Sequence, residues 1–246
     1  MNSYRGLAVV YDRLVAGVDF EGWIDYVESI LRHFGCSPAG VLDLACGTGN
    51  TLLPFALRGY RAKGVDISPE MIACARQKAA AAAVKIDYYV GDMRDFLLEH
   101  PVDLVTCFHD GLNYIVETED LERVFKNTAR NLAPGGMFIF DMNAVKWIGE
   151  ADGRPVVING GDMIIIYSTT YDTAASVWTV DLTCFIEEGG LYRKFSERHR
   201  ERGYEQEEIV KILEAAGFIP LAVYDAFSFS PPHPKSRRHF YVARRQ

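Results

Sequence analysis

Two glycines between a predicted strand and a predicted helix form the first part of this sequence that is suited to chemistry. The apolar run 41–44 predicts a buried strand, and Gly47 and Gly49 follow it directly. A helix is predicted next, with Asn50 as its cap. Such a junction presents free backbone N–H groups at the positive end of a helix dipole. Because glycine lacks a Cβ, a ligand can approach the backbone closely, and we expect a nucleotide-type ligand here.

Two acidic residues follow at the ends of the next predicted strands. Residues 63–67 predict a strand that carries Asp66, and residues 86–92 predict one that brings Asp92 to the same edge. A carboxylate at the first position can accept hydrogen bonds from both ribose hydroxyls, and one at the second suits the amine of adenine. The dinucleotide pattern needs a small residue at position 52, where this chain has Leu52. An NAD-linked dehydrogenase is therefore disfavoured.

Four motifs occur in the order typical of one enzyme family. They are residues 43–49 (DLACGTG), 66–71 (DISPEM), 91–95 (GDMRD) and 132–136 (LAPGG). As a set they resemble the class I S-adenosylmethionine (SAM) methyltransferases over most of residues 1–142. Ala45 departs from the broader pattern, which has another glycine at that position. The segment around Asp12, the run 91–96 and the later β-rich part also resemble small-molecule N-methyltransferases, including those that act on nucleotide-linked amino sugars.

The resemblance implies SAM as the cofactor, with S-adenosylhomocysteine as its product. The glycine turn admits the methionine part of SAM, while Asp66 binds the ribose. Ile67 and Met93 sandwich the adenine, and Asp92 faces its amine. The N-terminal segment folds over the cofactor with Tyr11 near the methyl donor. The predicted cofactor-binding residues are Tyr11, Asp43, Ala45, Gly47, Gly49, Asn50, Asp66, Ile67, Met71, Asp92, Met93 and Phe108.

The predicted reaction is transfer of the SAM methyl group to N or O of a small molecule by in-line displacement. The sulfonium is already activated, so alignment of the two substrates supplies much of the catalysis. An amine acceptor must first lose a proton, for which we consider His109, His199 and Tyr11 as catalytic candidates. Either imidazole can also be a hydrogen-bonded structural group. The alternative function is a catalytically silent SAM-binding or sensor module.

A basic cluster gives the only indication of what the acceptor carries. Lys235, Arg237 and Arg238 lie in a loop that we expect to leave the ligand-binding edge of the sheet. With the segment 198–202 they predict a rim that favours an anionic small molecule, because guanidinium groups match carboxylate and phosphate oxygens. A solvated loop tip is the alternative interpretation.

Composition and spacing argue against several other classes. The net charge of −7 and the absence of a base-flipping Asn/Asp-Pro-Pro-Tyr/Phe signature argue against nucleic acid as a partner. Five dispersed cysteines provide neither a zinc nor a disulfide framework. Asp141 and Asn143 resemble oxygen ligands of magnesium, yet no third carboxylate is identifiable, so we predict no metal. No leader or membrane-spanning run is found, and we expect a cytoplasmic protein.

The order of predicted elements indicates an α/β fold with a doubly wound, mostly parallel, seven-stranded Rossmann-like sheet. Strands and helices alternate five times up to Asp141. Residues 218–227 and 239–243 complete the sheet, and the strand 218–227 is expected to run parallel to the first five.

The pattern changes after Asn143. Glycines at 149, 153, 160 and 161 indicate a linker, and the runs 163–171, 177–185 and 191–199 then alternate at period two. We predict an inserted three-stranded antiparallel β-sheet whose exposed strands could pair in a homodimer. The predicted divisions are a SAM-binding core with an N-terminal helical cover (1–143), the insert (144–203) and the C-terminal completion of the core sheet (204–246).

Overall fold

The computed structural model describes residues 6–145 and 154–246, which form two β-sheets and the helices packed on them. Positions 149 and 153, which entered the predictions above, lie outside the described residues. The larger sheet has the order β10-β11-β5-β4-β1-β2-β3. Its strands are β1 (Gly40–Leu44), β2 (Arg61–Asp66), β3 (Asp87–Val90), β4 (Val102–Cys107), β5 (Leu132–Asn143), β10 (Phe218–Asp225) and β11 (Arg238–Arg245).

All but one of these seven strands run in the same direction. Strands β1 to β5 pair in parallel, and β11 is antiparallel to both β5 and β10. Strand β10 therefore runs with the first five, as predicted. Its carboxyl end points to the same edge as theirs, and the loop that follows it leaves from that edge. The strand order reverses between β1 and β4, which is where open α/β sheets bind ligands.

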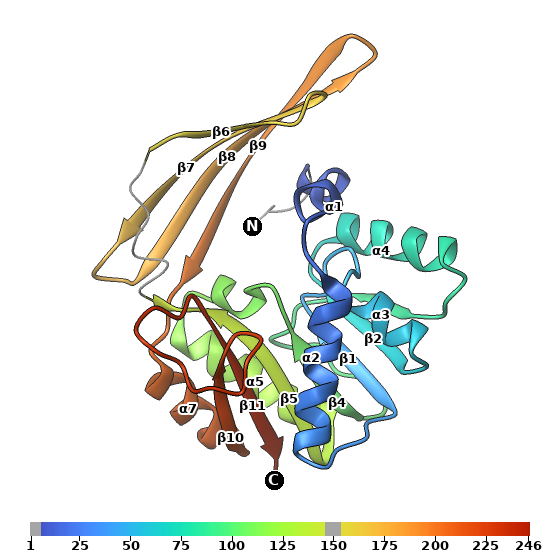
Figure 1. Ribbon diagram of the computed structural model, residues 1–246, viewed down its shortest axis with the longest axis vertical. Helices are drawn as coiled ribbons and strands as arrows, with labels where there is room; N and C mark the ends of the chain where they lie inside the picture. The colour runs from blue at the N-terminus through green and yellow to red at the C-terminus, as the bar shows by residue number, and fades with distance from the viewer. Residues whose placement is uncertain (1–5, 146–153) are drawn as a thin grey trace.

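Helices cover both faces of this sheet (Figure 1). On one face lie α2 (Phe20–His33), α3 (Leu52–Leu57) and α4 (Pro69–Ala81), and on the other α5 (Thr118–Asn131) and α7 (Gln206–Ala215). Helix α2 is capped by Asp19, whose carboxylate accepts from the Gly22 N–H, and it buries an apolar stripe that includes Ile24 and Val27. The doubly wound Rossmann-like architecture is confirmed. Among the described helices none is both long and apolar enough to cross a membrane.

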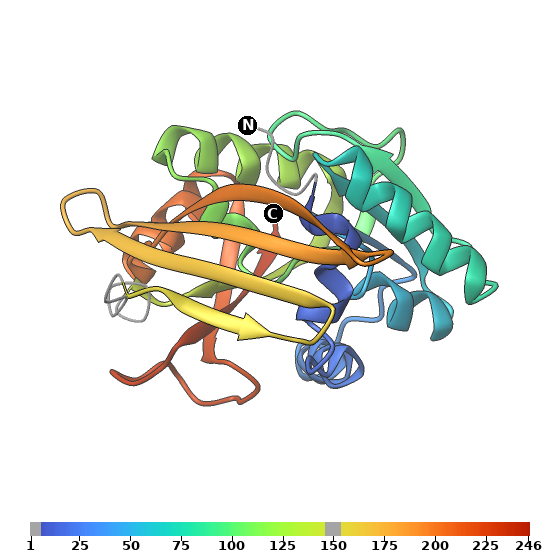
Figure 2. The same cartoon turned by 90° about the horizontal axis from the view of Figure 1, so that it is seen from above.

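The insert is a sheet of four strands rather than the predicted three. It comprises β6 (Val156–Asn159), β7 (Met163–Asp172), β8 (Val177–Glu188) and β9 (Leu191–Arg202), all antiparallel. We had assigned residues 156–159 to the linker because glycines occur on both sides of them. All four side chains of β6 are exposed, so the run shows no alternation of apolar and polar residues. These residues form a strand because they pair with β7, and not because one face of the strand is buried. Seen from above, the insert lies across the core (Figure 2).

The N-terminal segment lies between the two sheets. It comprises η1 (Leu7–Val9) and α1 (Tyr11–Leu14), drawn in dark blue beside the insert in Figure 1. The N–H groups of Gly6 and Leu7 donate to the Glu197 carboxylate on β9, at 2.9 and 3.1 Å. The side chains of Leu7 and Val10 are buried in a small apolar cluster with the inner face of β7 and β8. The segment therefore packs under the insert and over the core.

The fit of α3 on the sheet gives a test of this packing. A Cβ at Gly64 on β2 would lie 2.5 Å from Cδ1 of Leu52 and 2.7 Å from Sγ of Cys46, both buried. We expect Gly64→Ala to lower the free energy of unfolding by about 1–3 kcal/mol, measured by chemical denaturation. The matched control is Gly17→Ala, where a Cβ meets nothing within 4 Å. Equal stability of the Gly64→Ala variant and the parent would contradict this packing.

Candidate active site

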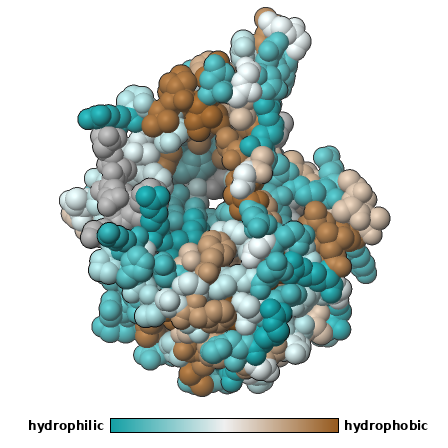
Figure 3. All heavy atoms as spheres, in the orientation of Figure 1, coloured by the Kyte–Doolittle hydropathy of each residue, from teal (hydrophilic) through white to brown (hydrophobic). Residues whose placement is uncertain are grey.

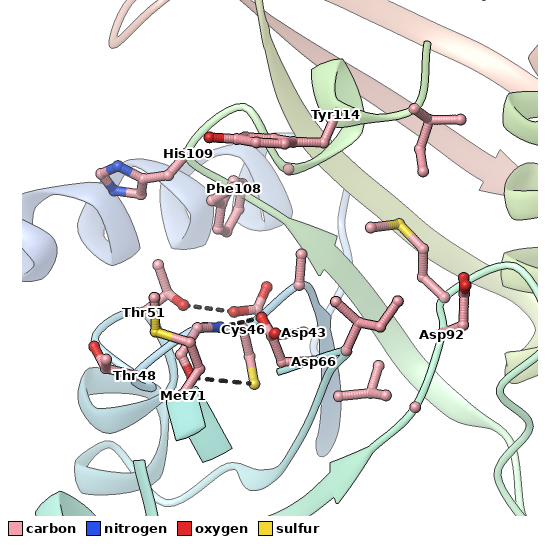
Figure 4. Close-up of a pocket in the computed structure, with 18 of the residues that line it drawn as sticks. Asp43, Cys46, Thr48, Thr51, Asp66, Met71, Asp92, Phe108, His109 and Tyr114 are labelled. Carbon is pink, nitrogen blue, oxygen red and sulfur yellow. Dashed lines mark hydrogen bonds between the residues drawn. The ribbon is translucent and has the colours of Figure 1, made fainter. Parts of the chain in front are cut away.

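A cavity of about 470 Å³ opens at the carboxyl edge of the core sheet, below the insert. Figure 3 shows the surface hollowed between the insert and the core. In the close-up of Figure 4, Asp43, Asp66 and Met71 lie on one side of the cavity, with Phe108, His109 and Tyr114 on the other. The cavity thus has a side formed by the glycine turn and a side formed by the chain after β4.

The glycine turn is held from beneath by a buried carboxylate. Asp43 on β1 accepts hydrogen bonds from the hydroxyls of Thr51 and Thr106, at 2.5 and 2.6 Å. Burial raises its pKa to about 6, although both hydroxyl donors oppose this shift. Ala45 and Gly47 both have positive φ angles, of 52° and 54°. The departure from glycine at position 45 is therefore accommodated in a left-handed conformation that alanine seldom adopts.

Gly49 lies behind the turn rather than in the wall of the cavity. Its φ is 79°, and a Cβ there would lie 2.2 Å from the Tyr88 hydroxyl oxygen. The requirement for glycine is therefore set by packing against β3. Asn50 is not the cap of α3 as predicted, since the helix begins at Leu52 after Thr51. The Asn50 amide instead donates to the Asp12 carboxylate at 3.0 Å, because the N-terminal segment folds over the turn.

Asp12 attaches the N-terminal segment to the glycine turn. Its carboxylate accepts from the Thr48 hydroxyl at 2.6 Å and forms an ion pair with Lys78 at 2.6 Å. Partial burial raises the pKa of Asp12, but the hydrogen bonds from Lys78, Thr48 and Asn50 outweigh it and hold the pKa below its ordinary value. Asp12 therefore stays ionised and keeps Tyr11, its neighbour in the chain, in the cavity wall.

The two acids predicted for the nucleoside occupy different environments. Asp66 accepts the N–H groups of Gly47 and Ser68, at 2.9 and 2.8 Å, and burial raises its pKa despite these bonds. The Arg94 guanidinium donates three hydrogen bonds to the Asp92 carboxylate, at 2.6 to 3.0 Å. Burial raises the pKa of Asp92, but Arg94 more than offsets this and lowers it. Arg94 also pairs with Asp120 at 2.6 Å, so this end of the cavity is negative overall.

The chain after β4 forms the opposite wall in a strained conformation. His109 and Asp110 have consecutive positive φ angles of 56° and 61°. The His109 ring stacks on Trp23 with ring centres 4.3 Å apart and an interplanar angle of 18°. Burial lowers the pKa of His109 to about 4, although Asp110 opposes the shift. Its Nε2 is buried without a hydrogen-bond partner within the described residues.

The predicted basic rim is wrong for Arg238. Its guanidinium is buried in ion pairs with Asp110, at 2.6 Å, and with Asp141. A sequence shows only that such a residue lies near a loop, and the packing of β11 on β5 brings it inside. The resemblance of Asp141 to a magnesium ligand is explained in the same way, because this carboxylate is held by Arg238. No metal-binding cluster of His, Cys, Asp or Glu occurs within residues 6–145 and 154–246.

Most of the predicted cofactor residues meet in this cavity. Its lining includes each of them except Gly49, and also His109, whereas His199 lies behind the wall. The sequence analysis missed Phe20, Thr48, Arg94, Tyr114 and Asp120, which also line it, whereas Arg200 falls in the segment 198–202 that was predicted for the rim. Arg94 was within the motif 91–95 and was accessible to prediction. Tyr114 comes from a short 3₁₀ turn, where no local pattern indicates a ligand.

Comparison with known proteins decides the class. Residues 41–136 match the family described as "Methyltransferase domain". A crystal structure of a SAM-dependent methyltransferase from Clostridium acetobutylicum ATCC 824 superposes with a TM-score of 0.89, at 27% identity and over 99% of both chains. This chain is a SAM-dependent methyltransferase. The predictions of an enzyme, of its family and of SAM as cofactor are confirmed.

Other relatives of the methyltransferase differ in what their names specify. A protein of Geobacillus sp. (strain WCH70), named for the methyltransferase class alone, is 29% identical over 99% of this chain and 100% of that protein. The dTDP-3-amino-3,4,6-trideoxy-alpha-D-glucopyranose N,N-dimethyltransferase of Streptomyces venezuelae is 28% identical over 85% of this chain and 89% of that enzyme. The sugar N-methyltransferase KedS8 from Streptoalloteichus sp ATCC 53650 is 25% identical, with a TM-score of 0.75 over 96% of this chain and 93% of that one.

The position of Asp66 leads to a first test of the site. We expect Asp66→Ala to weaken SAM binding by about 2–3 kcal/mol, which is about 30- to 150-fold, because the ribose and the Gly47 N–H both lose a charged acceptor. Titration calorimetry measures the change. Asp87→Ala, which removes a half-exposed acid paired with Lys63 on the adjacent strand, is the control and should bind SAM as the parent does. Unchanged affinity in a folded Asp66→Ala variant would show that Asp66 does not hold the ribose.

Proposed function

We propose that this methyltransferase transfers the methyl group of SAM to an amino group of a small molecule, and that nucleotide-linked amino sugars are the acceptors to test first. The observation that carries the proposal is the charge of the cavity. The carboxylates of Asp66, Asp92, Glu117 and Asp120 line it, and the nearby Asp110 charge adds to the rise that burial causes in the pKa of Tyr11. At the rim, the Arg200 side chain has no ion pair or hydrogen bond among the described residues. The carboxylates suit an acceptor that carries an amine, and the free Arg200 guanidinium suits a phosphate.

For SAM we propose the contacts expected from the sequence. The positive-φ turn at Gly47 leaves open space for the methionine part, since a Cβ there would meet nothing within 4 Å. Ile67 is 62% exposed although it is apolar, which is typical of a side chain that a ligand covers. It forms one side of the adenine site and Met93 the other. The Asp92 carboxylate accepts a hydrogen bond from the adenine amine, while Arg94 holds that carboxylate in place.

The proposed mechanism relies on alignment, which in favourable cases supplies about 7–11 kcal/mol. Tyr11 and Phe108 both line the cavity, and we place Tyr11 near the methyl donor. His109 is a candidate for positioning rather than for proton transfer, because an imidazole with a pKa near 4 is a weak base.

We assign cofactor binding to 1–143, the acceptor roof to 144–203 and completion of the core to 204–246. The ends of β5 at Asn143 and of β9 at Arg202 support these boundaries.

A screen of acceptor pairs tests the proposed function. Each pair consists of a dTDP-linked sugar that carries an amine and its analogue with a hydroxyl at the same carbon. We expect release of S-adenosylhomocysteine with an amine and none with its hydroxyl analogue. Only the amine, which arrives positively charged, is attracted by the acidic side chains of the cavity. Activity confined to hydroxyl acceptors would replace this proposal with O-methylation.

Arg200 provides a test of the acceptor class. We expect Arg200→Ala to raise the KM of a dTDP-linked amino sugar about tenfold and to leave the affinity for SAM unchanged, because a charge-assisted hydrogen bond to phosphate contributes about 1.5–3 kcal/mol. Arg193→Ala, on the same strand in a surface ion pair with Glu188, is the matched control. An equal KM in the Arg200→Ala variant and the parent would argue against an anionic part of the acceptor at this rim.

We also propose that the insert mediates a homodimer through β6. This strand pairs only on the β7 side within the described residues, and Val157 on it is 61% exposed. An apolar edge of this kind is suited to pairing with a second copy. We expect Val157→Lys to convert a dimer into a monomer, measured by light scattering after size-exclusion chromatography. Leu191→Lys, at an exposed hairpin end, is the control, and a parent protein that is monomeric would overturn the proposal.

A further inference from the structure

A pair of ionisable groups on the insert strand β9 lies directly behind the cavity residue Tyr114. The Tyr114 hydroxyl is 3.3 Å from Nδ1 of His199, and the two rings meet edge-on with centres 5.9 Å apart. Glu201, two residues further on the same face of β9, hydrogen-bonds to the Tyr114 side chain. In Figure 4 the hydroxyl end of Tyr114 points along the cavity toward His109. One hydroxyl therefore connects the acceptor side of the cavity with a carboxyl group that the cavity does not expose.

Glu201 is unusual for a carboxyl group on an exposed insert. Only 5% of the residue is exposed, and its Oε2 accepts from Nδ2 of Asn143 at 3.4 Å. Burial raises its pKa to about 8, and the charge of Asp110 adds to this rise. The hydrogen bonds from Asn143 and Tyr114 and the charge of Arg238 act in the opposite direction. A carboxyl group with such a pKa is matched to removing a proton from an ammonium group near neutral pH.

The groups that face Glu201 come from every element packed around it. Asp110 follows β4, Tyr114 lies on η2 (Gly111–Tyr114), Asn143 ends β5, Arg238 begins β11, and His199 precedes Glu201 on β9. The Arg238 charge is already shared by two carboxylates in its ion pairs. The described surroundings of Glu201 therefore contain more negative than positive charge, and they favour uptake of a proton.

We propose that Glu201 is a positioning residue that takes up the proton of the methyl acceptor through the Tyr114 hydroxyl. This role rests on the proposed function, since an amine arrives as an ammonium ion and has no lone pair to attack. One ammonium proton passes to the Tyr114 oxygen while the hydrogen of Tyr114 passes to the Glu201 carboxylate. The amine lone pair then forms the N–C bond, and the C–S electron pair stays on sulfur. The product leaves as the methylated ammonium ion with S-adenosylhomocysteine, and Glu201 returns its proton to solvent.

The pH dependence of the rate tests this role. The probe is dTDP-3-amino-3,4,6-trideoxy-α-D-glucopyranose, or whichever amine of the screen is most active. We expect Glu201→Gln to lower kcat about 100-fold at pH 7 and less than tenfold at pH 10, because at high pH the solvent has already deprotonated the amine. Glu201→Asp should recover part of the activity at pH 7, and the KM for SAM should not change. Glu188→Gln, at the exposed hairpin end of β8, is the matched control.

A second variant keeps the proposal falsifiable if Glu201→Gln does not fold. Tyr114→Phe interrupts the same path and should show the same loss at pH 7 and the same recovery at pH 10, and the double variant should lose no more than either single one. A loss that is constant across pH would overturn the role of Glu201 and leave the proposed function intact. A parent enzyme that transfers methyl groups to no amine would overturn the proposed function and this role together.

Unfolding measurements provide a readout that needs no acceptor. The pKa of Glu201 is higher in the folded protein than in the unfolded chain, where it is 4.5. Its carboxyl group therefore stabilises the fold most below about pH 4.5, and this contribution is lost as the pH rises toward 8. We expect Glu201→Gln to remove this part of the pH dependence of the free energy of unfolding. Identical pH dependence in the parent and in Glu201→Gln would overturn proton uptake by Glu201.

Discussion

The hydrogen bonds of the buried Asp43 carboxylate are the constraint on which the site depends. Asp43 is 2% exposed, and each of its oxygens accepts from one threonine hydroxyl, one before α3 and one on β4. A buried carboxylate is costly unless its oxygens are bonded, so both hydroxyls must stay in place. Three elements are thereby fixed at one point, at the reversal of strand order. The left-handed backbone at Ala45 and Gly47 comes directly after this anchor and lines the cavity.

The core and its cofactor edge were predictable because parallel strands end at a common edge. Once the strands were assigned, Gly47, Asp66 and Asp92 had to lie near one another, and the structure brings them to one cavity. The chemistry of each residue type then indicated a nucleoside. Local sequence was sufficient here, since Asp66 ends β2, and Gly47 and Asp92 follow the ends of β1 and β3 within three residues.

The remainder depends on contacts between distant segments, which spacing does not encode. Strand β6 has no buried face, so its four residues lack the alternation that marks a half-buried strand. Arg238 was assigned to a basic acceptor rim because it was placed in one loop with Lys235 and Arg237, yet antiparallel pairing of β11 with β5 places it between two carboxylates. Asn50 was expected to cap a helix, but it binds Asp12 from 38 residues away. In each case a long-range partner replaces the local one.

The N-terminal segment is attached both to the core and to the insert. Asp12 binds the glycine turn of the core, and the backbone of Gly6 and Leu7 binds Glu197 of the insert. A single stretch of chain thus joins the glycine turn to the insert and contributes Tyr11 to the cavity lining. Because one stretch is bonded to both, a displacement of the N-terminal segment from the core is transmitted to the insert through Glu197. We therefore expect the binding and release of the two substrates to be coupled through this one short segment.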